Sequence, residues 1–163
     1  RRSSDLIGDL LALERIPFIA LDADPHDIRQ ARQAGINVVF GNADRREVMQ
    51  AAGLARARAV VITYPDTHSA ERALRIVRQT RPEIPVVIRT ADDKDTARLK
   101  AAGATEVIPE VLEGSLLIAA ETLVQAGIPM SQAIQHVRAA RAERYASLRD
   151  FYEPEEGKPR TPS

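Results

Sequence analysis

Apolar residues in the first two thirds of the chain come in short, unbroken runs, and polar residues follow each run. Strands of a parallel sheet are buried on both faces, so they form continuous apolar runs rather than alternating ones. The pattern therefore predicts five buried strands, at 18–21, 37–40, 59–62, 86–88 and 106–108.

Helical patterns separate these runs, and three of the helices end in an Ala-Gly pair just before the next strand. The pairs are Ala34-Gly35, Ala52-Gly53 and Ala102-Gly103, and Asp92-Asp93 is predicted to begin the last of these helices. A further helix at 4–15 comes first, with an apolar side formed by Leu6, Ile7, Leu10, Leu11 and Leu13. Strands that alternate with helices predict an α/β fold with a parallel sheet and right-handed crossovers.

Four successive strands end in polar residues, namely Asp22, Asn42, Thr63 and Arg89. The carboxyl ends of parallel strands form the ligand crevice of an open α/β sheet, so we expect these residues to converge there. Asp22 suits ribose hydroxyls, and Asn42 suits an adenine edge or a ribose. Thr63 and the helix start after it suit a phosphate, and Arg89 suits a phosphate or a partner carboxylate.

The pattern changes after Glu110, where two helices replace the alternation. The first, about 112–126, is strongly apolar, and its surface suits either a subunit interface or packing on the sheet. The second begins at a Ser131 cap and runs to about Leu148, and its residues Arg141, Arg144 and Arg149 are interpreted as a solvated face. We predict a domain at 1–110, helices at 111–149 with a dimer contact, and a disordered tail at 150–163.

Composition excludes several functional classes. Twenty-three Lys and Arg balance 23 Asp and Glu, which argues against nucleic-acid binding driven by charge. Cysteine is absent, so disulfides and thiolate chemistry are excluded. The histidines lie in three different predicted helices without metal-ligand spacing, and no catalytic constellation is found. We therefore assign no catalytic residue, no metal site and no enzymatic activity.

Taken together, the phrases PFIALDADP, VVFGNAD, ITYPDTHSA, VVIRTADD and AAGATEVIPEVLEGSLL are similar to the TrkA-N domain, also called the RCK or KTN domain. The most similar branch is the one at the cytoplasmic end of Kef-type monovalent cation:proton antiporters, which are potassium efflux systems. The resemblance covers about residues 5–148. It implies a nucleotide-binding Rossmann fold that regulates ion transport, binds NAD(H) or an adenine nucleotide such as AMP, ADP or ATP, and is not catalytic.

By its motifs, the resemblance makes Asp22 the ribose-binding acid and Asn42 a residue of a GDA/GNA-type motif, with Thr63 and Arg89 lining the pocket. It also implies a homodimer through a crossover helix at 111–127. Family members begin with a strand and a GxGxxG turn, and this sequence lacks both before its first helix. We therefore expect a Rossmann-like, doubly wound parallel sheet lacking its first strand, with C-terminal helices, from a chain whose membrane antiporter domain lies upstream. This places it as a cytoplasmic domain of an inner (plasma) membrane protein.

Two other functions stay open at this point. A cofactor-binding fragment of an NAD-dependent dehydrogenase would need a catalytic domain with a placed acid or base, and nothing after Glu110 supplies one. A bare interaction module with a degenerate pocket would form dimers without binding nucleotide.

Overall fold

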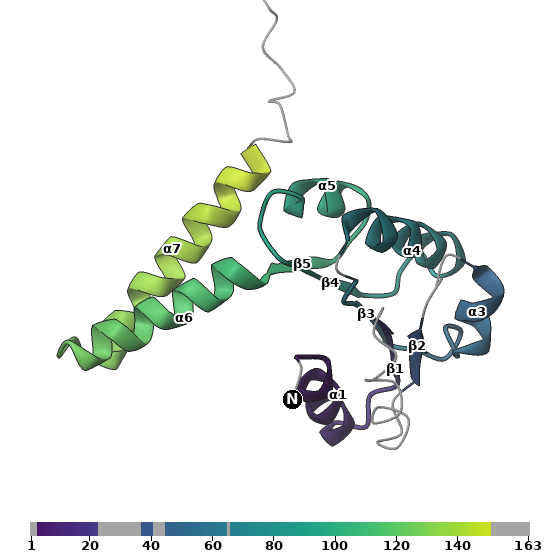
Figure 1. The fold of residues 1–163 in the computed structure, drawn as a ribbon, viewed down its shortest axis with the longest axis horizontal. Coiled ribbons are helices and arrows are strands. Elements are labelled where there is room, and N and C mark those ends of the chain that lie inside the picture. The colour runs from purple at the N-terminus through teal and green to yellow at the C-terminus, as the bar shows by residue number, and fades with distance from the viewer. Residues whose placement is uncertain (1–2, 23–36, 41–44, 65, 151–163) are drawn as a thin grey trace, which may run out of the picture. The chain divides into compact units, whose positions relative to one another are not determined.

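The computed structural model describes residues 3–22, 37–40, 45–64 and 66–150, and they fall into two compact units (Figure 1). The first unit comprises Arg1–Glu110 and the second Val111–Ser163. The predicted helix between the first two strands and the predicted disordered tail lie outside the described residues, apart from Asp150.

The first unit is built on one parallel sheet of five strands, as the apolar runs predict. The strands are β1 (Phe18–Asp22), β2 (Asn37–Phe40), β3 (Ala59–Ile62), β4 (Val86–Thr90) and β5 (Glu106–Pro109). Their order in the sheet is β2-β1-β3-β4-β5, and every neighbouring pair is parallel. The fold is thus the expected Rossmann-like α/β sheet, and β1 and β3 pair directly where the first strand of the complete fold would separate them.

Successive residues of the central strands point to opposite faces of the sheet and join different apolar clusters. Ile19 and Val60 belong to the main core, whereas Phe18 and Val61 form a smaller cluster with Ile7 of the first helix. The main core packs under α3 (Arg46–Ala51), α4 (Thr67–Thr80) and α5 (Thr96–Ala101), while α1 (Ser3–Leu13) covers the other face (Figure 1). The sheet therefore has helices on both faces.

The apolar side predicted for the first helix is only partly buried. Ile7 and Leu11 pack against the smaller cluster, but Leu6, Leu10 and Leu13 are exposed. The helix thus packs only part of its predicted apolar side against the sheet. Only one stripe of an α-helix can contact the strand residues Phe18, Ala20, Ala59 and Val61 on this face of the sheet.

The helix predicted to begin at Asp92-Asp93 begins later. α5 starts at Thr96, with Asp95 at the N-cap position, so the capping role assigned to the earlier acids is wrong. The backbone carbonyl of Asp92 accepts a hydrogen bond from the Thr90 hydroxyl at 2.8 Å, and its carboxylate accepts one from the Lys94 amide at 3.2 Å. These local bonds close a turn before the helix can start.

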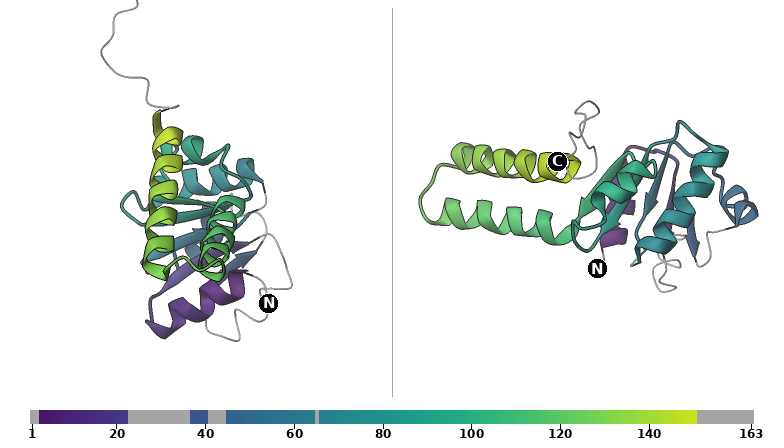
Figure 2. Two further views of the ribbon diagram at one scale, coloured as in Figure 1. Left: turned by 90° about the vertical axis from the view of Figure 1, so that its left-hand side faces the viewer. Right: turned by 90° about the horizontal axis from the view of Figure 1, so that it is seen from above.

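The second unit is a pair of antiparallel helices, α6 (Glu110–Gln125) and α7 (Met130–Asp150), which lie side by side in Figures 1 and 2. A turn containing Gly127, whose φ is 95°, connects them. The second helix starts at Met130, so Ser131 is inside the helix rather than at its cap. The arginine face is also not simply solvated, because Arg141 binds Glu113 of the facing helix with a contact of 2.7 Å.

Candidate functional site

The strand register brings the polar strand ends into one row at the carboxyl edge of the sheet. Asp22 stands opposite Phe40, and Leu21 opposite Ile62. The Thr63 amide donates to the Leu21 carbonyl at 2.9 Å, which continues the ladder by one residue. The backbones of three predicted site residues, at positions 22, 63 and 89, therefore lie near one another on adjacent strands.

Asp22 is the last residue of β1, which is where the sequence places it. Its side chain lies outside the described residues, and so does Asn42 as a whole. Their roles as ribose-binding and adenine- or ribose-binding groups stay predictions. The register nonetheless shows that β2 and β1 end side by side, which is the arrangement those roles require.

Thr63 directs its hydroxyl into the protein. The side chain is 2% exposed, and the hydroxyl donates to the Leu21 carbonyl at 3.1 Å. The hydroxyl thus ties the end of β3 to the end of β1, in addition to the bond made by the amide. Contact between this hydroxyl and a phosphate stays a prediction. What the structure shows is that Thr63 holds the neighbouring strand ends together.

Arg89 contacts a backbone carbonyl and a carboxylate within the protein, and its role toward a ligand stays a prediction. One terminal nitrogen donates to the Thr63 carbonyl at 2.8 Å, and the other lies 3.3 Å from a carboxylate oxygen of Glu110. The guanidinium therefore bridges the end of β3 and the residue that follows β5. A fork of N–H donors is suited to holding two such acceptors at once.

A pocket of about 390 Å³ opens beside Arg89, between the carboxyl ends of β3 and β4. Three basic and three acidic side chains line it, together with a histidine: Arg89, Lys94, Arg98, Asp66, Asp92, Asp95 and His68. Sequence reasoning identified only Arg89 of this set as a site residue. The polar run from Thr90 to Asp95 directly after a strand was the signal, because such loops form the crevice of an open α/β sheet.

The helix start at the pocket is held in place by its own cap. The Asp66 carboxylate accepts a hydrogen bond from the Ser69 amide at 2.7 Å, and this bond lowers the pKa of Asp66 below its ordinary value. On the next residue, the Thr67 hydroxyl donates to the Asp95 carboxylate at 2.6 Å. The two contacts fix the start of α4 and join it to the residue before α5.

Neither metal ligation nor membrane insertion is indicated by the residues that the structure describes. Among them, no three histidine, aspartate or glutamate side chains gather as a metal site. In the same residues, no helix combines the length and the apolar character needed to span a bilayer. The side chains that line the pocket beside Arg89 are mainly hydrogen-bond donors, acceptors and paired charges.

Comparison with known proteins places this geometry in a family. The family model of the TrkA-N domain matches residues 1–110, which comprise the whole of the first unit. A relative from Alkalimonas amylolytica, whose name proposes it to be the K(+) efflux antiporter KefB, is 36% identical over 146 residues. K(+) efflux antiporter 1 of Arabidopsis thaliana, a chloroplast protein, is 32% identical over 152 residues.

Both matches cover most of this chain but little of the relative. They extend over 90% and 93% of the chain, and over only 22% and 13% of the length of the relatives. The chain thus corresponds to a minor part of these antiporters, and their overall length reaches far beyond it.

A solved structure with the same fold is the Shewanella denitrificans Kef C-terminal domain in its AMP-bound form, with a TM-score of 0.76 and 22% identity. The similarity covers 93% of this chain and 92% of that one. The TrkA-N domain of the Escherichia coli inner membrane protein ybaL has a TM-score of 0.62 and 26% identity, over 77% of this chain and 90% of that one. The matched model, the named relatives and the parallel sheet agree, and the chain belongs to the TrkA-N domain family.

Proposed function

We propose that the chain is the regulatory nucleotide-binding domain of a potassium or other monovalent cation:proton antiporter. Nucleotide in the crevice favours one arrangement of the domain, and the attached transporter responds to that bias. The observation that carries the proposal is the row of strand ends at positions 22, 63 and 89, found in a chain whose relatives are named as K(+) efflux antiporters.

The ligand we propose is NAD(H) or an adenine nucleotide. Two proteins of the same fold carry such ligands in their names, the AMP-bound Kef domain and a GsuK channel bound to NAD. The GsuK protein shares 20% identity with this chain, with a TM-score of 0.55 over 69% of it. Asp22 at the end of β1 would accept hydrogen bonds from ribose hydroxyls, and these are common to both ligands.

Calorimetry on the full-length protein tests the site. Asp22→Ala should weaken binding of NADH or AMP by about 1–3 kcal/mol, because a ribose hydroxyl is left without its partner. The matched control is Glu47→Ala, which removes an exposed carboxylate from α3 and should leave the affinity unchanged. Equal affinities of the wild type and Asp22→Ala would reject the assigned site.

A dehydrogenase cofactor domain is the alternative function. It shares the Rossmann-like sheet, since the fold alone does not distinguish the two. The matched relatives are named as transport proteins, which favours regulation. Hydride transfer from NADH to any small substrate by the full-length protein would favour the dehydrogenase instead.

The partners we propose are a second copy of the chain and a membrane antiporter domain upstream, on the cytoplasmic side of the inner (plasma) membrane. The helix at 111–127 is the proposed dimer contact. Its large apolar side chains Val111, Leu117 and Ile118 are exposed, and no described residue of α6 is buried. An apolar face of this kind on a helix marks an interaction surface.

Sedimentation of the full-length protein tests the contact. Leu117→Glu should shift the equilibrium from dimer to monomer, because a charge would be buried in an apolar interface. Leu13→Glu is the matched control, since it introduces the same charge at an exposed leucine of α1. Dimers that persist in Leu117→Glu would exclude α6 as the contact.

A further inference from the structure

An ion pair between Arg89 and Glu110 connects the pocket to the start of α6. Arg89 is a residue of β4 and lines the pocket, while Glu110 is the first residue of α6. Pro109 ends β5 and pairs with Thr90, and no residue separates Pro109 from the helix. A change in the position of Glu110 therefore acts on the first turn of α6 without a flexible linker between them.

The Arg89 contacts differ in how easily an anion could replace them. The Thr63 carbonyl is backbone at a strand end, and its 2.8 Å bond holds the guanidinium at the crevice. The Glu110 carboxylate is 3.3 Å away, and the two side chains of that pair are 31% and 47% exposed. Ion pairs this exposed are weak, because water and salt screen them.

A phosphate group can compete with Glu110 for this guanidinium. It offers more acceptor oxygens and can bind an arginine through two parallel hydrogen bonds, which are shorter and stronger than neutral ones. The pocket beside Arg89 has a volume of about 390 Å³, which is enough to admit such a group. Lys94 and Arg98 line the same pocket and add positive charge, although Asp92 and Glu71 already pair with them.

We infer that Glu110 and an anionic group of the bound ligand compete for Arg89, and that this exchange carries the state of the crevice to α6. The inference rests on the proposed function and names the contact through which ligand binding would affect α6. In the empty crevice Arg89 holds Glu110 and the first turn of α6. In the occupied crevice Arg89 turns to the anion, and the Glu110 carboxylate is released.

Glu110→Gln in the full-length protein tests the competition, with AMP and adenosine as the probes in calorimetry. The variant removes the competing charge, so AMP should bind about 2- to 5-fold more tightly, in keeping with the weakness of exposed pairs. Adenosine has no phosphate, and its affinity should stay unchanged. In an Arg89→Ala background, Glu110→Gln should have no effect on AMP affinity, because the contested partner is gone.

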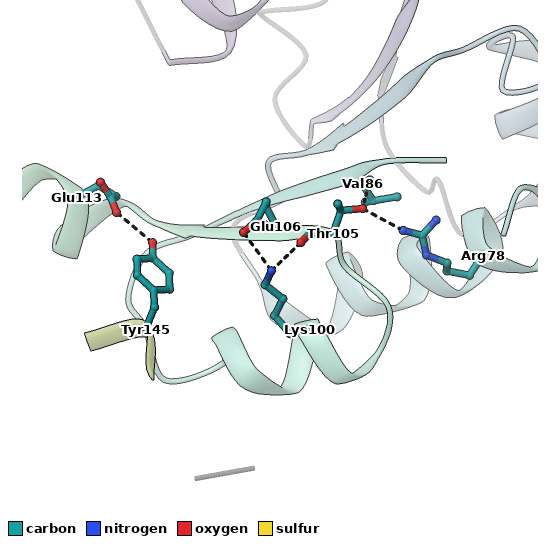
Figure 3. A network of polar contacts seen from close by, with 7 residues as sticks. All are labelled: Arg78, Val86, Lys100, Thr105, Glu106, Glu113 and Tyr145. Carbon is teal, nitrogen blue, oxygen red and sulfur yellow. Dashed lines mark hydrogen bonds and ion pairs between the residues drawn. The ribbon is translucent and has the colours of Figure 1, made fainter. Parts of the chain in front are cut away.

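Glu106→Gln is the matched control. It removes the same charge from β5, four residues before Glu110, where the carboxylate pairs with Lys100 at 3.0 Å (Figure 3). AMP affinity should equal that of the wild type in this variant. Equal tightening in Glu106→Gln would show a general effect of charge and overturn the competition.

Hydrogen exchange of the amides in the first turn of α6 gives the second readout. Saturating AMP should speed their exchange in the wild type, and Glu110→Gln should show the faster exchange without ligand. A wild type that binds AMP while Glu110→Gln leaves both affinity and exchange unchanged overturns the inference alone. A wild type that binds neither AMP nor NADH overturns the proposed function, and the inference with it.

Discussion

The two units of the chain hold themselves together in different ways. In the sheet unit, apolar residues from β1, β3, β4 and β5, and from α3, α4 and α5, meet in one buried cluster. In the helical pair, Ala133 is the one buried residue among those the structure describes. Polar contacts join its two helices instead. The Glu113 carboxylate accepts a hydrogen bond from Arg141 at 2.7 Å. It accepts another from Tyr145 at 3.0 Å (Figure 3).

This difference separates a unit with a buried apolar core from a unit whose large apolar side chains are exposed. Burial of apolar surface is the dominant favourable contribution to folding, and exposed ion pairs add little. The sheet unit can therefore keep its strand ends in register whether or not a ligand is present. The helical pair has the weaker internal contacts, which suits a segment that responds to a ligand or to a second copy.

The largest effect on stability is expected from shortening a buried side chain in the core of the sheet unit. Leu74 of α4 is completely buried, and Leu74→Ala should lower the free energy of unfolding by about 2–5 kcal/mol through lost burial and the cavity left behind. Urea unfolding of the monomer measures it. Leu117→Ala, the same change at an exposed position of α6, should cost less than about 0.5 kcal/mol. Equal losses of unfolding free energy in the two variants would show that the sheet unit does not depend on apolar burial more than the helical pair does.

A smaller loss of unfolding free energy is expected when Arg78 is replaced. This residue bonds to the segments that precede β4 and β5, at the amino-terminal end of the sheet. Its guanidinium donates to the carbonyls of Ile84 at 2.6 Å and Gly103 at 2.8 Å, and to the Thr105 hydroxyl (Figure 3). Arg78→Ala leaves these acceptors without that donor and should cost about 1–3 kcal/mol in the same urea experiment.

Arg78→Lys sharpens this test, because a single ammonium cannot reach acceptors on both sides of a planar fork. Most of the loss should therefore remain in the lysine variant. Full recovery would mean that the positive charge matters and the geometry does not. Arg141→Ala, at the corresponding contact of the helical pair, should cost less than about 1 kcal/mol, since its side chain is 42% exposed and ion pairs this exposed contribute little.

The sheet could be predicted from the sequence because burial leaves a local signature. Each strand contains a continuous apolar run, and a polar residue follows directly where β3 ends, at Ile62 and Thr63. The meeting of the strand ends follows from parallel pairing alone. The contact of Arg89 with the Thr63 carbonyl is not predicted, because the sequence suggests only a phosphate or a carboxylate as its partner.

Contacts between residues distant in the sequence could not be predicted. The Thr67–Asp95 hydrogen bond depends on how α4 and α5 pack on the sheet. The same packing brings together the residues that line the pocket. The pairing of Arg141 with Glu113 depends on the register of two antiparallel helices. A single helix pattern shows an arginine face, but it does not show which facing residue will meet it.

The smallest effect is expected from the pH dependence of the helical pair. Hydrogen bonds from Arg141, and then from Tyr145, lower the pKa of Glu113, although partial burial opposes the shift. A carboxyl whose pKa is lower in the folded state stabilises that state above its unfolded pKa of about 4.3, and the contribution is lost as the pH falls through the folded value. Glu113→Gln should therefore lower the melting temperature at pH 7, by an amount equivalent to less than about 1 kcal/mol.

The difference between Glu113→Gln and the wild type should shrink as the pH falls below about 4, because protonation then removes the charge in both proteins. Thermal unfolding followed by circular dichroism at several pH values measures it. Glu121→Gln is the control on the same helix, since that carboxylate contacts Gln125 rather than a cation. A Glu113→Gln difference that stays constant from pH 7 to pH 3 would show that Glu113 contributes by packing, and that the two helices are not held by charge.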